Sequence, residues 1–371
     1  MALAHERRPN QRAAPSWRTD HEPGLLKAVT LTATGGLEHL RIQDVPPPEL
    51  RAAGDVLVRV RAAALNRLDL FVVGGLPGVS YRFPHILGSD GAGVVERVGS
   101  AVSRVRPGDR VMVNPGVSCG HCEWCEAGEQ PLCRAFGILG EHRPGTFAEY
   151  LVVPEGNLAP VPESMDWARA AAFPLTTLTA WRMLVTRARL RAGETVLIWG
   201  IGGGVALAAL KIAKLCGARV IVTSSSDHKL ARAAELGADV TLNHATQDVA
   251  REVRTLTARR GVEVVVDTVG ELTWEHSLRA LAPRGRLVTC GATSGPHCLT
   301  DVRKLFWYQW DILGSTMGSH GDFQAVATLA HQGRLWPEVD AVFPLDQADR
   351  ALRRLAEGAQ FGKVVLEVGH E

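Results

Sequence analysis

Two hydrophobic patterns divide the chain, and the first is a series of short apolar runs. Between Lys27 and about Val113 these runs are rich in Val, Ile and Leu and are interrupted by Pro and Gly. Runs of this kind are typical of β-strands. They are LKAVTL, DVLVRVRAAAL, GAGVVERVG and DRVMV, and AEYLVV follows after a loop that contains several cysteines. The sequence therefore predicts a β-rich domain, a barrel or a sandwich, that ends near Pro162.

The second pattern begins after Pro162, where helical segments alternate with fully apolar runs. The segment WARAAAFPLTTLTAWRMLV has the spacing of a helix. The apolar runs that follow are TVLIWG, RVIVTS, DVTLN, VEVVVDTVG and GRLVTCG. The helix before VEVVVDTVG is expected to end near Gly261. Apolar strands separated by helices indicate a parallel sheet covered on both faces. We expect a doubly wound α/β domain over residues 163–339, followed by one more helix and the strand GKVVLEV.

Size and charge restrict the class of protein. The chain has 371 residues, 41 basic and 39 acidic, and a net charge of +2. The length fits two domains, and the charge balance argues against nucleic acid or a membrane surface as a partner. No apolar stretch reaches the roughly 18 residues of a membrane span, and the first 24 residues do not resemble a signal peptide. We expect a cytoplasmic protein with a mobile tail over residues 1–24.

A glycine cluster follows the first apolar strand of the second half. Gly200 begins it, and a helical segment follows directly. Glycines in this context let a backbone approach a pyrophosphate, and the start of the helix favours an anion. A glycine turn that binds nothing is the alternative. We expect a dinucleotide to be held by Gly202, Gly203, Gly204, Val205 and Ala206.

The end of the next strand predicts which dinucleotide binds. An acidic residue there would hold the ribose 2'-hydroxyl and repel a 2'-phosphate. Ser224 and Ser225 stand at this place, and Lys229 follows within reach of a phosphate. Hydroxyls and a cation favour NADP(H). Asp227 is the counter-argument, unless it is the N-cap of a helix that starts at His228.

Four of the seven cysteines have the spacing of a metal site. They form the pattern C-x2-C-x2-C-x7-C and are Cys119, Cys122, Cys125 and Cys133. Four thiolates complete the tetrahedral coordination of zinc and leave no open position. We therefore expect one structural Zn²⁺ per chain, with four free thiols as the alternative. The other three cysteines are expected to be small buried hydrophobes.

Taken together, these motifs resemble the medium-chain dehydrogenase/reductase superfamily. The resemblance rests on LGSDGAGVVERVG, GDRVMV, the cysteine loop, GTFAEY, the glycine cluster and GKVVL, and covers about Lys27 to Val368. It implies a GroES-like catalytic domain over residues 25–162, completed by residues 340–371, and a Rossmann domain over residues 163–339. The active site would lie between the two. It also implies a homodimer or homotetramer in which the strand of LFWYQWDILGSTMG pairs with its two-fold mate, unless aromatic side chains of the same chain cover that edge.

The chain departs from zinc alcohol dehydrogenases at the catalytic zinc. The three ligand positions that the resemblance assigns hold Asn66, Ser89, and Pro174 or Leu175. Only the carboxylates of Asp69 and Asp90 remain near these positions in the sequence. Two carboxylates without Cys or His make a poor zinc site, so we expect no catalytic zinc. Alcohol oxidation then lacks its Lewis acid. The sequence predicts hydride transfer to an acceptor that takes up charge itself, as an activated C=C bond or a quinone does.

The resemblance also implies roles for single residues. Asn66 matches an Asn of quinone oxidoreductases, where it would bind substrate or order the nicotinamide ribose, although a turn residue is the alternative. Arg67 and Lys363 match basic positions that contact the cofactor, and Thr179 falls where a Thr touches the nicotinamide. His142 lies where alcohol dehydrogenases line the substrate pocket. The candidate catalytic residues are Asn66, Asp69 and His142.

Together, these expectations predict an NADPH-dependent reductase of quinones, enones or enals. A zinc alcohol dehydrogenase with unorthodox ligands is one alternative, and an NADPH-binding protein without turnover is another. Enoyl-thioester reductases of the superfamily have a Tyr before the Pro that follows the Asn segment. Leu76 stands before Pro77 here, which disfavours acyl-coenzyme A substrates.

Overall fold

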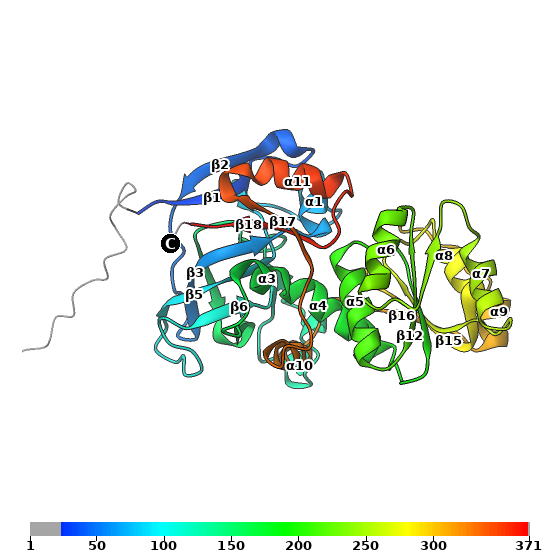
Figure 1. Cartoon of the computed structure of the whole chain (residues 1–371). Coiled ribbons are helices and arrows are strands. Elements are labelled where there is room, and N and C mark those ends of the chain that lie inside the picture. Colours follow the sequence, from blue (N-terminus) through cyan, green and yellow to red (C-terminus); the bar gives the residue numbers. More distant parts are fainter. Residues whose placement is uncertain (1–23, 370–371) are drawn as a thin grey trace, which may run out of the picture.

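The computed structural model describes residues 24–369, which fold into two lobes that lie side by side (Figure 1). One lobe is built mainly from β-strands, and the other is a parallel sheet with helices on both faces. This arrangement confirms the predicted fold class. All but the last residue of the tail predicted over residues 1–24 lies outside the described residues.

The β-rich lobe contains a seven-stranded sheet in the order β10-β6-β5-β3-β18-β17, in which β9 also pairs with β3. A three-stranded sheet in the order β2-β1-β4 lies beside it. Along β3, Val58 and Val60 are buried while Arg59 and Arg61 are partly exposed, because successive side chains of a strand point to opposite faces. The elements are β1 (Leu26–Leu31), β2 (Leu40–Val45), β3 (Asp55–Ala64), α1 (Arg67–Gly74), β4 (His85–Ile86), β5 (Asp90–Val98), β6 (Arg110–Val113), β9 (Tyr150–Pro154) and β10 (Leu158–Pro160).

The cysteine loop leaves this lobe as a small extension. It contains the elements β7 (Gly116–Val117), α2 (Glu123–Glu126) and β8 (Gly137–Ile138). β7 and β8 pair antiparallel and close the base of the loop.

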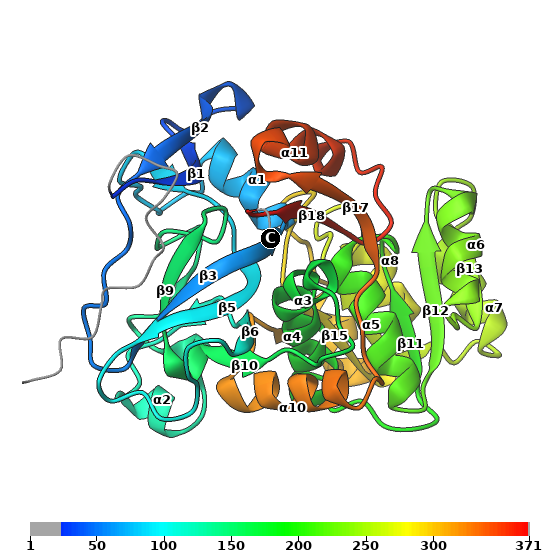
Figure 2. The same cartoon turned by 60° about the vertical axis from the view of Figure 1, so that its left-hand side comes forward.

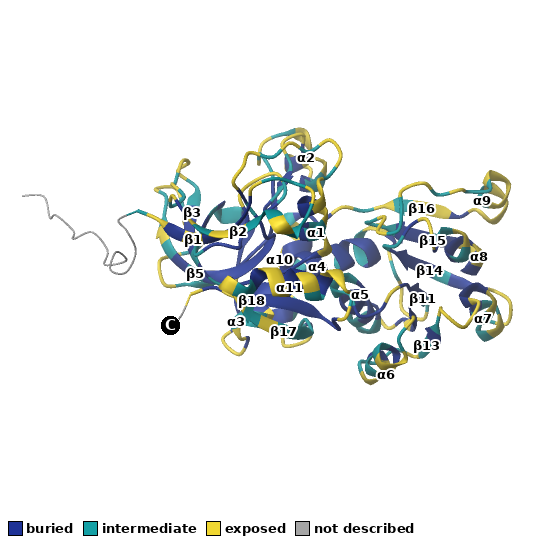
Figure 3. Cartoon of the chain, turned by 90° about the horizontal axis from the view of Figure 1, so that it is seen from above, coloured by how far each residue is buried: buried dark blue, intermediate teal, exposed yellow. Residues whose placement is uncertain are grey.

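The second lobe is a six-stranded sheet in the order β13-β12-β11-β14-β15-β16. All neighbouring strands are parallel, as expected for a doubly wound fold. Its central strands are dark blue in Figure 3 because helices cover both faces. The elements are β11 (Thr195–Ile198), α5 (Gly204–Leu215), β12 (Arg219–Ser224), α6 (Asp227–Glu235), β13 (Val240–Asn243), α7 (Val249–Leu256), β14 (Val262–Asp267), α8 (Trp274–Ala280), β15 (Leu281–Thr289), α9 (Val302–Tyr308) and β16 (Asp311–Gly314).

Two predicted boundaries in this lobe are wrong. The helix before β14 ends at Leu256 and not near Gly261, because Ala258 and Arg259 have left-handed φ angles of 49° and 69°. β15 starts at Leu281, directly after α8, so it is longer than the predicted run GRLVTCG.

Helices lie at the junction between the lobes (Figure 2). The predicted helical segment breaks at Pro174, which lacks a backbone N–H, into α3 (Trp167–Ala172) and α4 (Pro174–Trp181). α3 packs on β3 and β5, so this part of the predicted Rossmann segment lies on the β-rich lobe. α4 packs against α5 and against α10 (His320–His331).

The chain then returns to the β-rich lobe. β17 (Val339–Pro344), α11 (Ala348–Ala356) and β18 (Lys363–Glu367) follow α10. β18 pairs antiparallel with β3, opposite Val365 and Ala64. This pairing brings Lys363 to the end of β3. None of the helices between residues 24 and 369 has the length and apolar character that a bilayer crossing requires.

Candidate active site

A cluster of buried polar side chains lies where three strands of the β-rich lobe begin or end. Asn66 follows β3, Asp90 begins β5 and Lys363 begins β18. Lys363 Nζ donates to Asp90 Oδ2 at 2.8 Å and to Asn66 Oδ1 at 2.5 Å. Asp90 is 0% exposed and Lys363 is 4% exposed. A buried ammonium of this kind is tolerated because a carboxylate and an amide oxygen replace its water.

Asp90 also holds the start of α4. Its Oδ1 accepts a hydrogen bond from Leu175 N at 2.7 Å, in the first turn of that helix. Free N–H groups and the helix dipole favour a carboxylate at this place. The other oxygen accepts from Asn66 Nδ2 at 2.9 Å. The carboxylate of Asp90 therefore connects β5, β18 and the junction helix.

Asp69 lies on α1, next to this cluster. Its Oδ2 accepts a hydrogen bond from Asn66 N at 2.7 Å. Burial is the main cause that raises the pKa of Asp69 from 3.8 to about 7, and the Lys363 ammonium partly opposes the rise. A carboxyl group with this pKa exchanges its proton near neutral pH.

The three positions of the absent zinc ligands converge, as the resemblance implies. Asn66 and Leu175 both contact Asp90, and Ser89 precedes it. Ser89 Oγ donates to Leu139 O at 2.7 Å. The amide of Asn66 is also committed, because Nδ2 donates to Asp90 and to Ala64 O while Oδ1 accepts from Lys363. The cation that stands beside these positions is the Lys363 ammonium.

The glycine cluster forms the turn between β11 and α5. Gly203 is the N-cap and Gly204 the first helical residue. A Cβ at Gly204 would lie 2.7 Å from Thr176 Cγ2 and 2.9 Å from Lys363 Cδ, so only glycine fits where the two lobes meet. Val205 lies in the first turn of α5, and Ala206 is buried in the core and supports helix–strand packing. This start of a helix, with glycine backbone exposed to the junction, fits a pyrophosphate.

Thr179 and Arg67 face the same junction. Thr179 is buried in α4, and its hydroxyl has no hydrogen-bond partner within the described residues. An orphaned buried hydroxyl is rare and fits a group that a bound cofactor or substrate satisfies. Arg67 is exposed at the start of α1, and its charge contributes to lowering the pKa of Lys229 across the junction.

The Lys229 ammonium, which we expect near a cofactor phosphate, is bonded to the protein itself. Lys229 Nζ donates to Gly358 O at 2.6 Å and therefore points to the β-rich lobe, beside Gly202. Burial is the main cause that lowers its pKa. Ser224 is buried, with Oγ accepting from Ser226 N at 3.1 Å, while Ser225 is exposed.

Asp227 does not cap a helix that starts at His228. α6 begins at Asp227 itself, and the N-cap is Ser226, whose side chain accepts from Lys229 N. Asp227 instead accepts from Asn243 Nδ2 at 2.7 Å. Four consecutive residues of cap-forming type precede this helix, so the sequence alone did not distinguish them.

Two further residues, which belong to no sequence motif, lie at the edge of the sheet where we expect the cofactor. Trp199 follows β11 and His244 follows β13, and their ring centroids lie 6.0 Å apart. His244 N donates to Ser224 O at 3.1 Å, so this His lies at the tip predicted to choose the dinucleotide. Their position directly after parallel strands could have indicated them from the sequence, because ligands of such sheets bind at that edge.

His142 is not joined to the polar cluster. Its Nδ1 accepts from Ile138 N at 3.3 Å, within its own loop, and lies 3.7 Å from Glu141 Oε2. No hydrogen bond between described residues connects it to Asn66, Asp90 or Lys363. The structure therefore does not bring the three candidate catalytic residues together.

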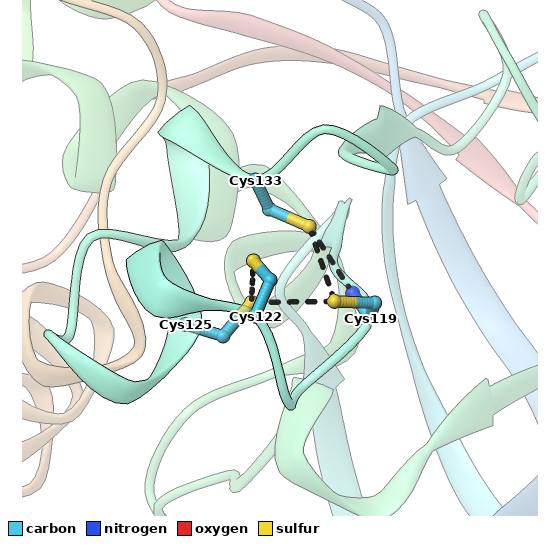
Figure 4. Close-up of side chains that lie close together, drawn as sticks. All are labelled: Cys119, Cys122, Cys125 and Cys133. Carbon is cyan, nitrogen blue, oxygen red and sulfur yellow. Dashed lines mark hydrogen bonds between the residues drawn. The ribbon is translucent and has the colours of Figure 1, made fainter.

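The four cysteines form the expected metal-binding group (Figure 4). Their sulfur atoms all lie within 4.8 Å of one another. The separations are 3.5 Å for Cys119 and Cys133, 3.6 Å for Cys122 and Cys125, and 3.9 Å for Cys119 and Cys125. Tetrahedral zinc with thiolates requires sulfur separations of about 3.8 Å. Within residues 24–369, no other group of three or more His, Cys, Asp or Glu side chains lies close enough to hold a metal.

Comparisons with known proteins agree with this geometry. The alcohol dehydrogenase GroES-like domain family matches residues 52–163, and the zinc-binding dehydrogenase family matches residues 204–332. A quinone oxidoreductase of Pseudomonas aeruginosa is 36% identical over 92% of this chain and 99% of its own. An acryloyl-coenzyme A reductase of Metallosphaera sedula is 31% identical over 89% of this chain and 96% of its own. A crystal structure of an NAD-dependent alcohol dehydrogenase is 48% identical, covers 92% of this chain and 100% of that chain, and has a TM-score of 0.89.

The predicted family and enzyme class are thus confirmed. Both lobes match dehydrogenase domain families, and the relatives span nearly the whole chain. The protein is an NAD(P)H-dependent oxidoreductase, and it belongs to the medium-chain dehydrogenase/reductase superfamily.

Proposed function

We propose that the chain reduces quinones, enones or enals with NADPH and without a catalytic zinc. The observation that supports this most strongly is the Asn66–Asp90–Lys363 cluster. An amide and an ammonium group lie at the place where the resemblance assigns zinc ligands, and neither is a zinc ligand. A structural zinc in the four-cysteine loop completes the proposal.

The acceptor class follows from the missing Lewis acid. Oxidising an alcohol requires its hydroxyl to be acidified, which a bound metal does efficiently. An activated C=C bond or a quinone instead carries its own electron-withdrawing group, which takes up the charge after hydride arrives. Reduced nicotinamide supplies that hydride. The protein then has to orient the acceptor and donate hydrogen bonds to the developing oxyanion.

Two groups of this chain fit those tasks. The Thr179 hydroxyl is buried and uncommitted, so it is the donor that we assign to the oxyanion or to the nicotinamide amide. The Lys363 ammonium lies beside Asn66, and the one N–H that Asp90 and Asn66 leave unused is the donor that we assign to the developing oxyanion. Asn66 acts as a positioning residue that holds Lys363, since its own amide is fully used.

We assign NADPH as the preferred cofactor on Ser224 and Ser225. No carboxylate stands at these two positions, so nothing there repels a 2'-phosphate or takes the ribose hydroxyls. Lys229 Nζ lies beside Gly202 and donates to Gly358 O, so we do not assign the 2'-phosphate to this ammonium. The exposed ring of His244 beside Ser224 is an additional polar group for a phosphate at this tip.

We also propose a homodimer formed through β16, with a homotetramer as the larger alternative. β16 is the last strand of its sheet, and Ile312 on it is 36% exposed. An open apolar edge invites pairing with another strand. Phe306 and Trp307 are 65% and 75% exposed, so they do not cover this edge, whereas Trp310 is buried.

The four thiols of the metal loop require a reducing compartment, for which we propose the cytoplasm.

Alcohol oxidation is the second candidate, because the NAD-dependent alcohol dehydrogenase structure is 48% identical to this chain. The test is a panel of a quinone, an enone, an enal, a ketone and an acyl-coenzyme A ester with NADPH, and alcohols with NADP⁺. We expect turnover of the quinone, enone or enal, and a lower kcat for Thr179→Val. Thr328→Val, exposed on α10, is the control that should match the parent. Turnover of alcohols alone contradicts the proposal, and cofactor binding without any turnover favours a binding protein.

A further inference from the structure

A hollow lies on the parallel-sheet lobe, far from the candidate active site. It measures about 570 Å³ and is bounded by α7, the end of α8, and α9. Figure 1 shows these helices at the end of the molecule away from the β-rich lobe. They pack on one face of the sheet, whereas α5, which follows the glycine cluster, packs on the other face.

The walls of this hollow are fixed by contacts within the protein. Arg254 donates to the carbonyl oxygens of Arg259, Arg260, Arg279 and Leu281, at 2.7 to 3.1 Å, and so ties the end of α8 to the loop after α7. On the other side, the Trp310 indole donates to Ala282 O at 3.0 Å and is buried. Residues held in this way do not have to be ordered when a ligand binds.

Tyr308 lies flat on this anchored indole. The two ring centroids are 5.2 Å apart and the planes differ by 24°. Tyr308 is 38% exposed, whereas Trp310 is only 7% exposed. Trp310 covers one face of the Tyr308 ring, so the solvent-exposed part of Tyr308 is the rest of its side chain. This part offers a surface on which another ring can stack.

Three cations around the hollow have no ion-pair partner within the described residues. Five basic side chains and one carboxylate line it, although the chain as a whole carries 41 basic and 39 acidic residues. Asp248, the one carboxylate, is already paired with Arg279 at 3.4 Å. Arg251, Arg259 and Lys304 are exposed and form no ion pair with any residue between 24 and 369.

The nearby carboxylate of Asp301 does not neutralise the three unpaired cations. It interacts electrostatically with Lys304 but is bonded to Arg303 through both oxygens. Like charges gathered around one hollow repel each other, so a bound anion stabilises them. The local excess of positive charge therefore indicates an anionic ligand.

We propose that this hollow binds a nucleoside phosphate. Arg251, Arg259 and Lys304 would hold the phosphate oxygens, since guanidinium groups bind them in pairs. The exposed side of Tyr308 would stack on the base, as aromatic rings do with nucleobases. The volume of 570 Å³ lies within the range of about 300 to 1,000 Å³ that small-ligand sites occupy.

Isothermal titration calorimetry with ADP tests the proposal on enzyme saturated with NADPH, so that the dinucleotide site is filled. We expect one ADP site per chain, weakened by about tenfold or more in Arg259→Ala, Lys304→Ala and Tyr308→Ala. Arg334→Ala is the control, because Arg334 is an exposed cation in the turn after α10, outside the hollow, and this variant should bind ADP unchanged.

Two further comparisons make the result decisive. Ser224→Asp changes only the proposed dinucleotide tip, so unchanged ADP affinity in this variant supports a separate site even if the assignment of NADPH fails. The proposal is wrong if NADPH-saturated enzyme does not bind ADP, or if Arg259→Ala and Lys304→Ala bind it normally. Equal affinity for pyrophosphate and ADP, with no effect of Tyr308→Ala, would overturn the nucleoside part.

Discussion

The Lys363 ammonium lies 2.8 Å from Asp90 Oδ2, although 273 positions separate the two residues in the chain. Asp90 in turn accepts from the first turn of α4, so the pair connects the returning strand β18 to the helix that packs against the nucleotide-binding lobe. A buried charge pair in this position serves the site and the stability of the fold together.

Replacing Lys363 should leave the buried Asp90 carboxylate without a counter-charge, although Leu175 N and Asn66 Nδ2 still donate to it. We expect Lys363→Met to lower the free energy of unfolding by about 3 to 5 kcal/mol. The double variant Lys363→Met/Asp90→Asn should recover part of this loss, because Asn still accepts from Leu175 N and carries no charge. Denaturant unfolding measures both. Equal stability of the single and double variants would show that the pair is not a coupled charge pair.

The tip of β12 should decide between the two dinucleotides. Ser224→Asp is expected to weaken NADPH binding and strengthen NADH binding, since a carboxylate accepts the ribose hydroxyls and repels the 2'-phosphate. Thr328→Asp, on exposed α10, is the control for an added charge. Quenching of protein fluorescence gives both dissociation constants. If the unmodified protein binds NADH more tightly than NADPH, the interpretation of this tip is wrong.

Stability should depend on pH through Asp69. Its folded pKa of about 7 lies above the ordinary value of 3.8, so between these values the folded protein binds a proton that the unfolded chain has lost. The free energy of unfolding therefore falls as pH rises through this window and levels off above about pH 7. Urea unfolding of Asp69→Asn, compared with the parent across that range, should show a shallower decrease. An identical pH dependence would exclude Asp69 as its source.

The β16 edge should control assembly. We expect light scattering to report a dimer of the 39.9 kDa chain, and Ile312→Lys to yield monomers that tend to aggregate. Val342→Lys is the matched control, because Val342 is an exposed apolar residue on β17 in the other lobe. A single species of 39.9 kDa for the parent protein would contradict the dimer.

Local features of the site could be predicted from the sequence because their residues are close in the chain. The four cysteines fall within one loop of 15 residues, from Cys119 to Cys133, so their spacing alone indicated the group that the structure shows. The same holds for the glycine turn, where a strand and a helix flank Gly203 and Gly204 directly.

Contacts between distant segments could not be predicted in this way. The bond from Lys363 to Asn66 depends on the pairing of β18 with β3, and the position of the Lys229 ammonium depends on Gly358 in the other lobe. His142 stands just before GTFAEY in the sequence, but the hydrogen bond from Ile138 N holds its ring in its own loop. His244 belongs to no motif, and only the order of the parallel strands places it beside Ser224.

We propose that the chain transfers hydride while it holds a structural zinc and no catalytic zinc. Zinc content and turnover measured on the same enzyme sample test this proposal most directly. We predict one zinc per chain, bound by Cys119, Cys122, Cys125 and Cys133, together with NADPH-dependent reduction of a quinone or enone. Two tightly bound zinc ions per chain, or turnover that is lost with a second zinc while the four-cysteine zinc stays bound, would contradict it.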